Sequence, residues 1–354
     1  MANGCIESVG EFISKIDKTL QKWHSISQRI SVAWFRGERK RDNKLRPKLF
    51  DRIDEIGDKS KKLTFENDIV QEFRMRAPAL YMRTPLYERI DEWLFLMRHN
   101  ELPTRLLDWT EGALFALFFA INEIVSKPNL DPNNPDSPVV WVLNPIIFNF
   151  VASGRMFLPL SWNDRSNLYY KKAYRLALKH AANEEKLEKA KKGEGNLRWF
   201  ACPGNIRAAF ALPKRDSKIK YEEEYPIALK PQHIHPRVTA QRSCFTVHGE
   251  NECGIEKIFE NKQMEKLINN QKDALSYEIN REEFPDVEKV LKKIKKKYRA
   301  EKFNDLFLKK IEVSAKIKDI KSMLKELKWL GVSSSTLFPE LTGLSKELEF
   351  SAKL

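Results

Sequence analysis

A chain of 354 residues is long enough for one large domain with insertions or for two domains. Hydrophobic residues make up 42% of it and aromatic residues 11%, which is enough for a sizeable core and excludes global disorder. The formal net charge of +14 indicates an anionic partner such as a nucleic acid or a nucleotide, or else a lysine-rich solvated surface.

Helical spacing dominates the first third of the chain. Apolar residues recur at three- and four-residue intervals within residues 1–30, which predicts an amphipathic helix, and we take residues 1–28 as a separate N-terminal element. The apolar run that follows predicts a strand at 32–36 that enters the core. A mostly helical stretch is expected from about 64 to 98.

The segment "PTRLLDWTEGALFALFFA" contains the strongest helix signal. After a short extended piece, Asp108 stands three residues before Glu111, the spacing of a capping box, which predicts a helix that begins at Trp109. That helix is apolar nearly all round, so we expect it at the centre of the fold. Its apolar run, residues 113–121, is far shorter than the roughly twenty residues that a membrane span needs.

Further strands are predicted by "VVWVLNP", "EYPIALKP" and "RVTAQRSCFTVHG". Charged, helical insertions are expected at about 164–215 and 262–306, and the chain from 255 onward reads as helical and lysine-rich. Strands scattered among helices are typical of the α+β class. We therefore expect a mixed sheet core with a buried central helix, flanking helices and helical insertions.

Arg36 and Gly37 stand at the mouth of the first predicted strand. A buried guanidinium is costly unless it is paired, so Arg36 calls for a fixed partner or a ligand. Gly37 permits a sharp turn or a close approach. Asp108 is the expected partner of Arg36, with Arg105 in the same cavity; alternatively, Asp108 has only a structural role at the start of its helix.

Three residues of the last predicted strand, Arg237, Gln241 and Phe245, share one face by period two. This face either lines a polar pocket or is solvated. The His and Cys spacings fit no usual zinc pattern, so no metal is expected. The four cysteines form no CxxC pair and no signal peptide precedes them, which predicts a reducing, cytoplasmic setting.

Taken together, these motifs resemble the FRG domain family, which is named for an aromatic–Arg–Gly signature. The signature stands here as Phe35, Arg36 and Gly37. "RHNELPTRLLDWTEGALFALFFA" resembles the second block of the family, and "HPRVTAQRSCFTVHG" resembles the third. "LKWLGVSSSTLFPELTGLSKEL" is similar to the closing helices, so the resemblance covers roughly residues 29–354.

The chain departs from the family pattern at three positions. The family usually has Gly where Glu101 stands, Gln where Arg98 stands, and Gly where Ser243 stands. Side chains at these positions could narrow a cleft.

The resemblance implies a bacterial anti-phage or toxin-like effector, by association with the family's gene neighbourhoods. The first predicted strand of this chain is also similar to the strand with which ADP-ribosyltransferases begin their catalytic core. This similarity implies that NAD is the co-substrate and that Arg36 anchors the phosphates or ribose of NAD. The candidate catalytic residues are Arg36, Glu38, Asp108 and Gln241. The candidate cofactor-binding residues are Phe35, Gly37, Thr104, Arg105 and Arg237.

The alternative hypothesis is a non-catalytic module that binds nucleic acid through its basic surface, with Arg36 and Asp108 as a buried structural network. The basic runs at 171–192 and 291–299, interleaved with tyrosines, favour this alternative. An activating or neutralising protein partner is expected for an effector, and no membrane partner is expected.

Overall fold

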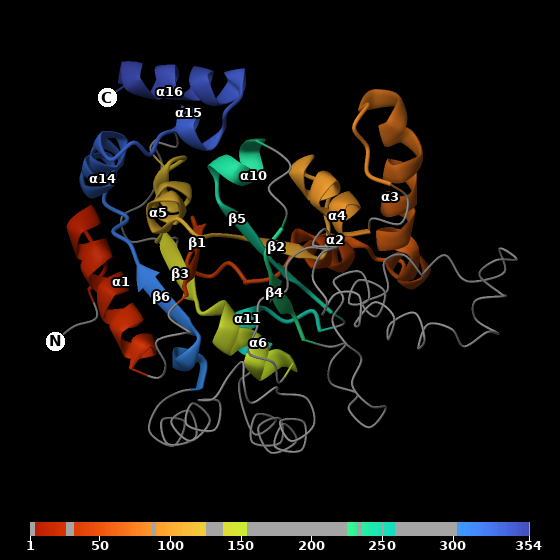
Figure 1. Ribbon diagram of the computed structural model, residues 1–354, viewed down its shortest axis with the longest axis horizontal. Helices are drawn as coiled ribbons and strands as arrows, with labels where there is room; N and C mark the ends of the chain where they lie inside the picture. Colours follow the sequence, from red (N-terminus) through yellow and green to blue (C-terminus); the bar gives the residue numbers. More distant parts are fainter. Residues whose placement is uncertain are drawn as a thin grey trace, which may run out of the picture.

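The computed structural model describes residues 4–25, 32–86, 90–124, 137–153, 225–231, 236–249, 251–258 and 303–353. Six described strands form one sheet in the order β4-β5-β2-β1-β3-β6 (Figure 1). The strands are β1 (Trp34–Glu38), β2 (Leu106–Thr110), β3 (Val139–Leu143), β4 (Ile227–Leu229), β5 (Ser243–Val247) and β6 (Leu308–Glu312). The α+β class is confirmed, with these strands all antiparallel rather than mixed in direction.

The sheet consists of two three-stranded ladders, β4-β5-β2 and β1-β3-β6, which meet at a short junction between β2 and β1. β1 pairs with β3 from Trp34↔Leu143 to Glu38↔Val139, and β2 pairs with β5 along its whole length. Between β1 and β2, however, the described residues form one cross-strand pair, Phe35↔Thr110. We call this short junction of β1 and β2 the seam, because the ladders β4-β5-β2 and β1-β3-β6 meet there.

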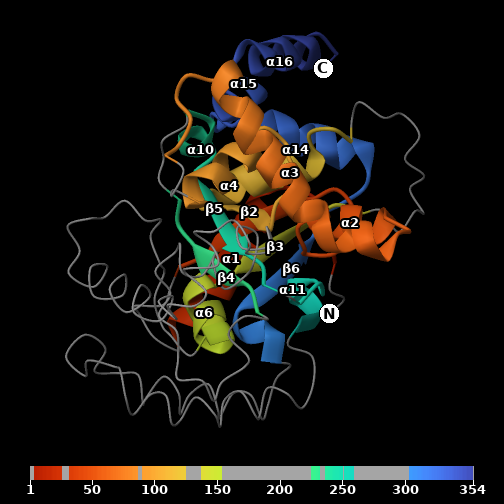
Figure 2. The same cartoon turned by 90° about the vertical axis from the view of Figure 1, so that its right-hand side faces the viewer.

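Eleven described helices surround the sheet. They are α1 (Val9–His24), α2 (Lys48–Glu55), α3 (Lys59–Leu80), α4 (Ile90–His99), α5 (Ala113–Ile121), α6 (Pro145–Ser153), α10 (Pro236–Ala240), α11 (Ile255–Ile258), α14 (Ile317–Trp329), α15 (Ser334–Leu337) and α16 (Leu341–Lys353). The helices α2, α3 and α4 gather on one side of the molecule, while α15 and α16 lie at its top (Figures 1 and 2).

Helix α5 packs directly on β1. A Cβ atom on Gly37 would lie 2.0 Å from the carbonyl oxygen of Ala116 and 2.6 Å from the amide nitrogen of Ala120. Alternate residues of a strand point to opposite faces, so Phe35 and Gly37 face α5 while Arg36 does not. The glycine of the signature therefore allows a helix backbone to approach the strand.

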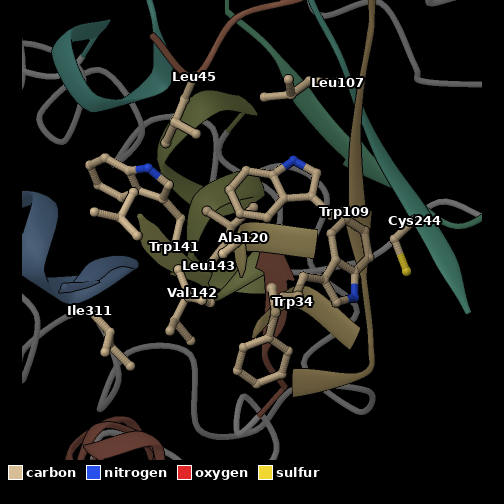
Figure 3. Packing of buried hydrophobic residues seen from close by; sticks show 14 of the residues in the cluster. Trp34, Leu45, Leu107, Trp109, Ala120, Trp141, Val142, Leu143, Cys244 and Ile311 are labelled. Carbon is tan, nitrogen blue, oxygen red and sulfur yellow. The ribbon is translucent and has the colours of Figure 1, made fainter. Parts of the chain in front are cut away.

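One hydrophobic core joins both ladders and the N-terminal helix. It includes Trp34, Trp109 and Trp141 together with aliphatic neighbours such as Leu107 and Val142 (Figure 3). The amphipathic helix predicted near the N-terminus is present as α1, and its Phe12 and Trp23 belong to this core. The chain up to His24 therefore packs with the rest of the fold.

The predicted strands at 32–36, in "VVWVLNP" and in "EYPIALKP" are confirmed as β1, β3 and β4. The helix predicted to begin at Trp109 instead begins at Ala113, with Gly112 as its N-cap, and Asp108 lies in β2. The capping-box spacing gave a wrong prediction because every residue of β2 pairs with β5. These backbone hydrogen bonds stabilise the strand more than a single capping interaction would stabilise a helix start.

The strand predicted to carry Arg237, Gln241 and Phe245 is also wrong in its first half. Arg237 lies in α10 and Gln241 in the turn after it, so only Phe245 is on a strand, β5. The chain after 255 was expected to be helical, yet Leu308–Glu312 forms the edge strand β6, whose lysines are typical of an edge. The insertions at 164–215 and most of 262–306 lie outside the described residues.

Candidate functional site

Arg36 bridges the seam. Its Nε donates to Oε1 of Glu38 at 2.6 Å, and its Nη1 donates to the backbone carbonyl of Asp108 at 2.8 Å. Its Nη2 has no hydrogen-bond partner within the described part of the chain, and a fifth of the side chain is exposed. The guanidinium is therefore held through Nε and Nη1, and Nη2 is the nitrogen that a ligand can reach.

The expected pair of Arg36 with Asp108 is present in a different form. The carboxylate of Asp108 is 3.9 Å from Arg36 Nη1, and the direct contact is to its carbonyl oxygen. The close carboxylate is Glu38, whose second oxygen accepts from Asn43 Nδ2 at 2.8 Å. Only 11% of the Glu38 side chain is exposed, so this acid is enclosed within its own hydrogen bonds.

The carboxylate of Asp108 is bound by Arg98. Nε of Arg98 donates to both carboxylate oxygens, at 3.0 and 2.9 Å, and Nη2 donates to Oδ2 at 2.5 Å. Burial raises the pKa of Asp108, but the charge and hydrogen bonds of Arg98 and the charge of Arg36 outweigh it, so the pKa lies below its ordinary value. At 37% side-chain exposure, Asp108 is an anion that a ligand can reach. We call Arg36, Glu38, Arg98 and Asp108 the seam site.

Arg98 is held by the end of α4. The amide of Leu102 donates to the carbonyl of Met97, and the amide of Glu101 donates to that of Arg98, which is the pattern of a Schellman motif. Glu101 occupies the left-handed position of this motif, with φ of 65°. Glycine adopts this conformation without steric cost, whereas a residue with a Cβ does not.

We expect Glu101→Gly to raise the free energy of unfolding by about 1 kcal/mol, because it relieves the left-handed conformation of a residue with a Cβ. Urea unfolding of the variant checks this value. Glu252→Gly, at an exposed position, serves as the control and should show no such gain. An unchanged or lower stability in Glu101→Gly would contradict the prediction.

Arg105 belongs to a separate, more enclosed ion pair. Its Nε donates to both carboxylate oxygens of Glu66 on α3, at 2.6 and 2.8 Å, and its Nη1 donates to the carbonyl of Gly249 at 2.6 Å. Both side chains are nearly buried, at 13% and 12% exposure. Burial raises the pKa of Glu66 even though Arg105 opposes the shift. Arg105 thus ties α3 to the start of β2 and is committed to that contact.

His248 lies buried just beyond β5. Its Nε2 is 3.3 Å from Oγ1 of Thr246, which accepts from the indole nitrogen of Trp109 at 3.2 Å. Its Nδ1 has no hydrogen-bond partner among the residues that the structure describes. Burial, together with the charges of Arg105 and Arg36, lowers the pKa of His248 to about 3, so the imidazole is neutral in the folded protein.

This buried imidazole predicts a loss of stability in mild acid. Below its ordinary pKa of about 6.5 the unfolded imidazole binds a proton that the folded one does not bind until the pH nears about 3. The unfolding free energy should therefore fall as the pH drops from about 6.5, by on the order of 2 kcal/mol at pH 5. Urea unfolding across this range should show His248→Gln losing that part of the slope.

His24→Gln, at an exposed helix end, is the matched control and should keep the slope of the wild type. An identical slope in His248→Gln and the wild type would show that another group titrates.

The remaining candidate residues are engaged elsewhere in the fold. Nε2 of Gln241 donates to the carbonyl of Leu337 at 3.1 Å, and Arg237 lies over the ring of Phe338 at 4.6 Å. These contacts join α10 and the turn before β5 to α15 and its C-cap residue. Oγ1 of buried Thr104 accepts from the amide of Leu106 at 3.3 Å.

Sequence reasoning missed Arg98, Glu66, Asn43 and His248 as parts of this region. Arg98 was noted only as a departure from the family pattern, and its bond to Asp108 spans a turn and a strand boundary that no local motif marks. Glu66 is one acid in a helical stretch rich in charges. Neither pair has a spacing that could have identified it.

The fold and the site define an α+β protein with a split antiparallel sheet and an arginine–carboxylate site at the split. Residues 31–128 match the FRG domain family, so this segment is an FRG domain, as its signature predicts. The matched segment contains the whole seam site. The wider resemblance, to residue 354, stays a prediction.

No curated protein and no solved structure matches the chain. Within the described ranges, no helix is long and apolar enough to cross a membrane. The same part of the chain contains no group of three or more His, Cys, Asp or Glu side chains that could hold a metal ion.

Proposed function

We propose that the seam site binds NAD and that the protein is an ADP-ribosyltransferase-like effector. The observation that supports this is the half-free guanidinium of Arg36 beside the exposed, anionic carboxylate of Asp108. A guanidinium held rigidly through two of its nitrogens, with the third open, suits the phosphates or ribose of a dinucleotide. An anion beside it suits the positive charge that develops on the sugar.

In this reaction the bond between C1′ of the ribose and the nicotinamide nitrogen breaks, and its electron pair leaves with nicotinamide. An acceptor nucleophile forms the new bond to C1′ and loses a proton. Asp108 is better suited than Glu38 to stabilise the cationic sugar, because 37% of its side chain is exposed against 11% for Glu38. Gln241 carries no charge and is bonded to Leu337, so it serves this role least well.

Transfer of label from NAD tests this function. The full chain is incubated with NAD labelled in its ADP-ribose part, together with bacterial lysate, DNA or RNA. We expect labelled acceptor and released nicotinamide, both reduced at least 100-fold by Arg36→Gln and by Asp108→Asn. The matched control is Arg46→Met, since Arg46 is also an arginine bound by two acids, Asp51 and Asp54, outside the seam site.

Thermal unfolding establishes that each variant is folded. Absence of nicotinamide release in every mixture, or full activity in folded Arg36→Gln, would overturn the proposal. The effector role predicts in addition that induced expression arrests bacterial growth and that Arg36→Gln abolishes the arrest.

A second candidate function, nucleic-acid binding, is favoured by the outer face of α14. Lys318, Lys321 and Lys325 are exposed there, and Trp329 at the helix end is 73% exposed, with Lys325 Nζ 5.4 Å from its ring. Lysines contact phosphates and an exposed indole can stack on a base. The basic runs at 171–192 and 291–299 lie outside the described residues.

For this candidate, a mobility-shift assay with single-stranded DNA or RNA should show binding that weakens as salt is raised. Trp329→Ala and Lys325→Ala should weaken it further. Binding that these substitutions leave unchanged would exclude α14 as the contact surface.

A further inference from the structure

We propose that Arg98 is a positioning residue that keeps Arg36 and Asp108 apart, so that both remain available to a ligand. The inference rests on the proposed function of the seam site. Neither the aromatic–Arg–Gly signature nor the sequence pattern assigns a role to Arg98.

The contacts show that Arg98, rather than Arg36, holds the carboxylate. Oδ2 of Asp108 is 2.5 Å from Nη2 of Arg98 and 3.9 Å from Nη1 of Arg36. Arg98 also donates to Oδ1, so its guanidinium binds both carboxylate oxygens. Nη1 of Arg36 donates instead to the backbone carbonyl of Asp108. Charge-assisted, two-point contacts of this kind are among the strongest hydrogen bonds in proteins.

Packing fixes the two partners relative to each other. Phe95 lies one helical turn before Arg98 on α4, and its ring stacks on Phe245 at a centroid distance of 5.2 Å. Phe245 is the cross-strand partner of Asp108. The stacked rings therefore dock α4 on the strand pair that carries Asp108, and the Schellman motif ends the helix immediately beyond Arg98.

Without Arg98, the carboxylate would turn to the nearest remaining cation. That cation is Arg36, only 3.9 Å away. A direct salt bridge would then occupy Nη2 of Arg36 and would turn the carboxylate away from the position in which Arg98 holds it. Arg98 thereby separates an anchoring cation from a stabilising anion within one small site.

Double-mutant cycles test this inference without any activity measurement. Urea unfolding of Arg36→Gln, Asp108→Asn and the double variant gives the coupling between Arg36 and Asp108. The same cycle is then measured in an Arg98→Met background. We expect the coupling to be at least twice as large there; an equal or smaller coupling would overturn the proposal.

Two backgrounds complete the test. Arg98→Gln replaces Arg98→Met if the latter does not fold, because the glutamine amide can still donate to Asp108 but carries no charge. This background too should raise the coupling between Arg36 and Asp108. The control background is Arg46→Met, which removes an arginine that pairs with Asp51 and Asp54 outside the seam site. It should leave the coupling between Arg36 and Asp108 at its wild-type value.

Kinetics then connects this coupling to function. Arg98→Met should raise KM for NAD at least tenfold, because Asp108 then pairs with Arg36. Millimolar ethylguanidinium, which replaces the missing guanidinium, should bring KM part of the way back. A purely structural Arg98 would lower stability without changing KM. If the wild type turns over no NAD, the proposed function fails, while the cycles still decide the role of Arg98.

Discussion

Gly37→Ala is expected to lower the free energy of unfolding by about 3 kcal/mol or more. The added Cβ would lie 2.0 Å from the Ala116 carbonyl oxygen and 2.6 Å from the Ala120 amide nitrogen, both backbone atoms of α5. No side-chain rotation can relieve such a contact, so α5 must move away from β1. Because α5 lies at the centre of the core, its displacement disturbs both ladders of the sheet.

Chemical denaturation of the purified variant measures this loss. Gly10→Ala is the matched control, because the nearest atom to its new Cβ is 4.0 Å away and alanine is the better helix residue in α1. We expect that control to be neutral or slightly stabilising. A stable Gly37→Ala protein would show that the glycine of the signature is not required for helix packing.

Glu66→Ala is expected to cost about 3–5 kcal/mol, because it leaves the enclosed guanidinium of Arg105 without its carboxylate. Replacing both partners by apolar residues of similar size, as in Glu66→Leu with Arg105→Met, should recover most of the loss. NAD turnover by the double variant should remain, since Arg105 is bound to Glu66 and Gly249 rather than facing the seam site.

Unfolding free energies of the single and double variants check this prediction. Glu123→Ala removes the acid of the exposed Arg39–Glu123 pair and should cost less than about 1 kcal/mol. If Glu66→Ala cost as little as this control, the Arg105–Glu66 pair would not be the tie that its geometry indicates. Loss of NAD binding in a stable double variant would instead show that Arg105 contributes to the NAD site.

Local patterns predicted the parts of the fold that depend on neighbours in the sequence. The apolar run before Arg36 predicted β1, and helical spacing predicted α1. Arg36 could be predicted as a site residue because a charged side chain at the end of a buried strand is costly without a partner, whichever part of the chain supplies that partner. For Gly37, the sequence left a turn and a close approach open, and the structure shows the close approach.

The predictions that failed depend on partners far away in the chain. Asp108 has the spacing of a helix cap, yet pairing with β5, more than a hundred residues later, makes its segment a strand. Likewise β6 is lysine-rich and forms because β3 offers an edge to pair with. The carboxylate partners of Arg98 and Arg105 follow from the packing of α4 and α3, which no single-sequence motif encodes.

Calorimetric titration of NAD into wild type and Arg36→Gln tests most directly whether the seam site is a dinucleotide site. We predict that the wild type binds NAD and that folded Arg36→Gln binds it at least tenfold more weakly, with Arg46→Met unchanged. Equal affinity in wild type and Arg36→Gln, or no binding by the wild type, would contradict the proposed function. Nucleic-acid binding through α14 would then be the function to pursue.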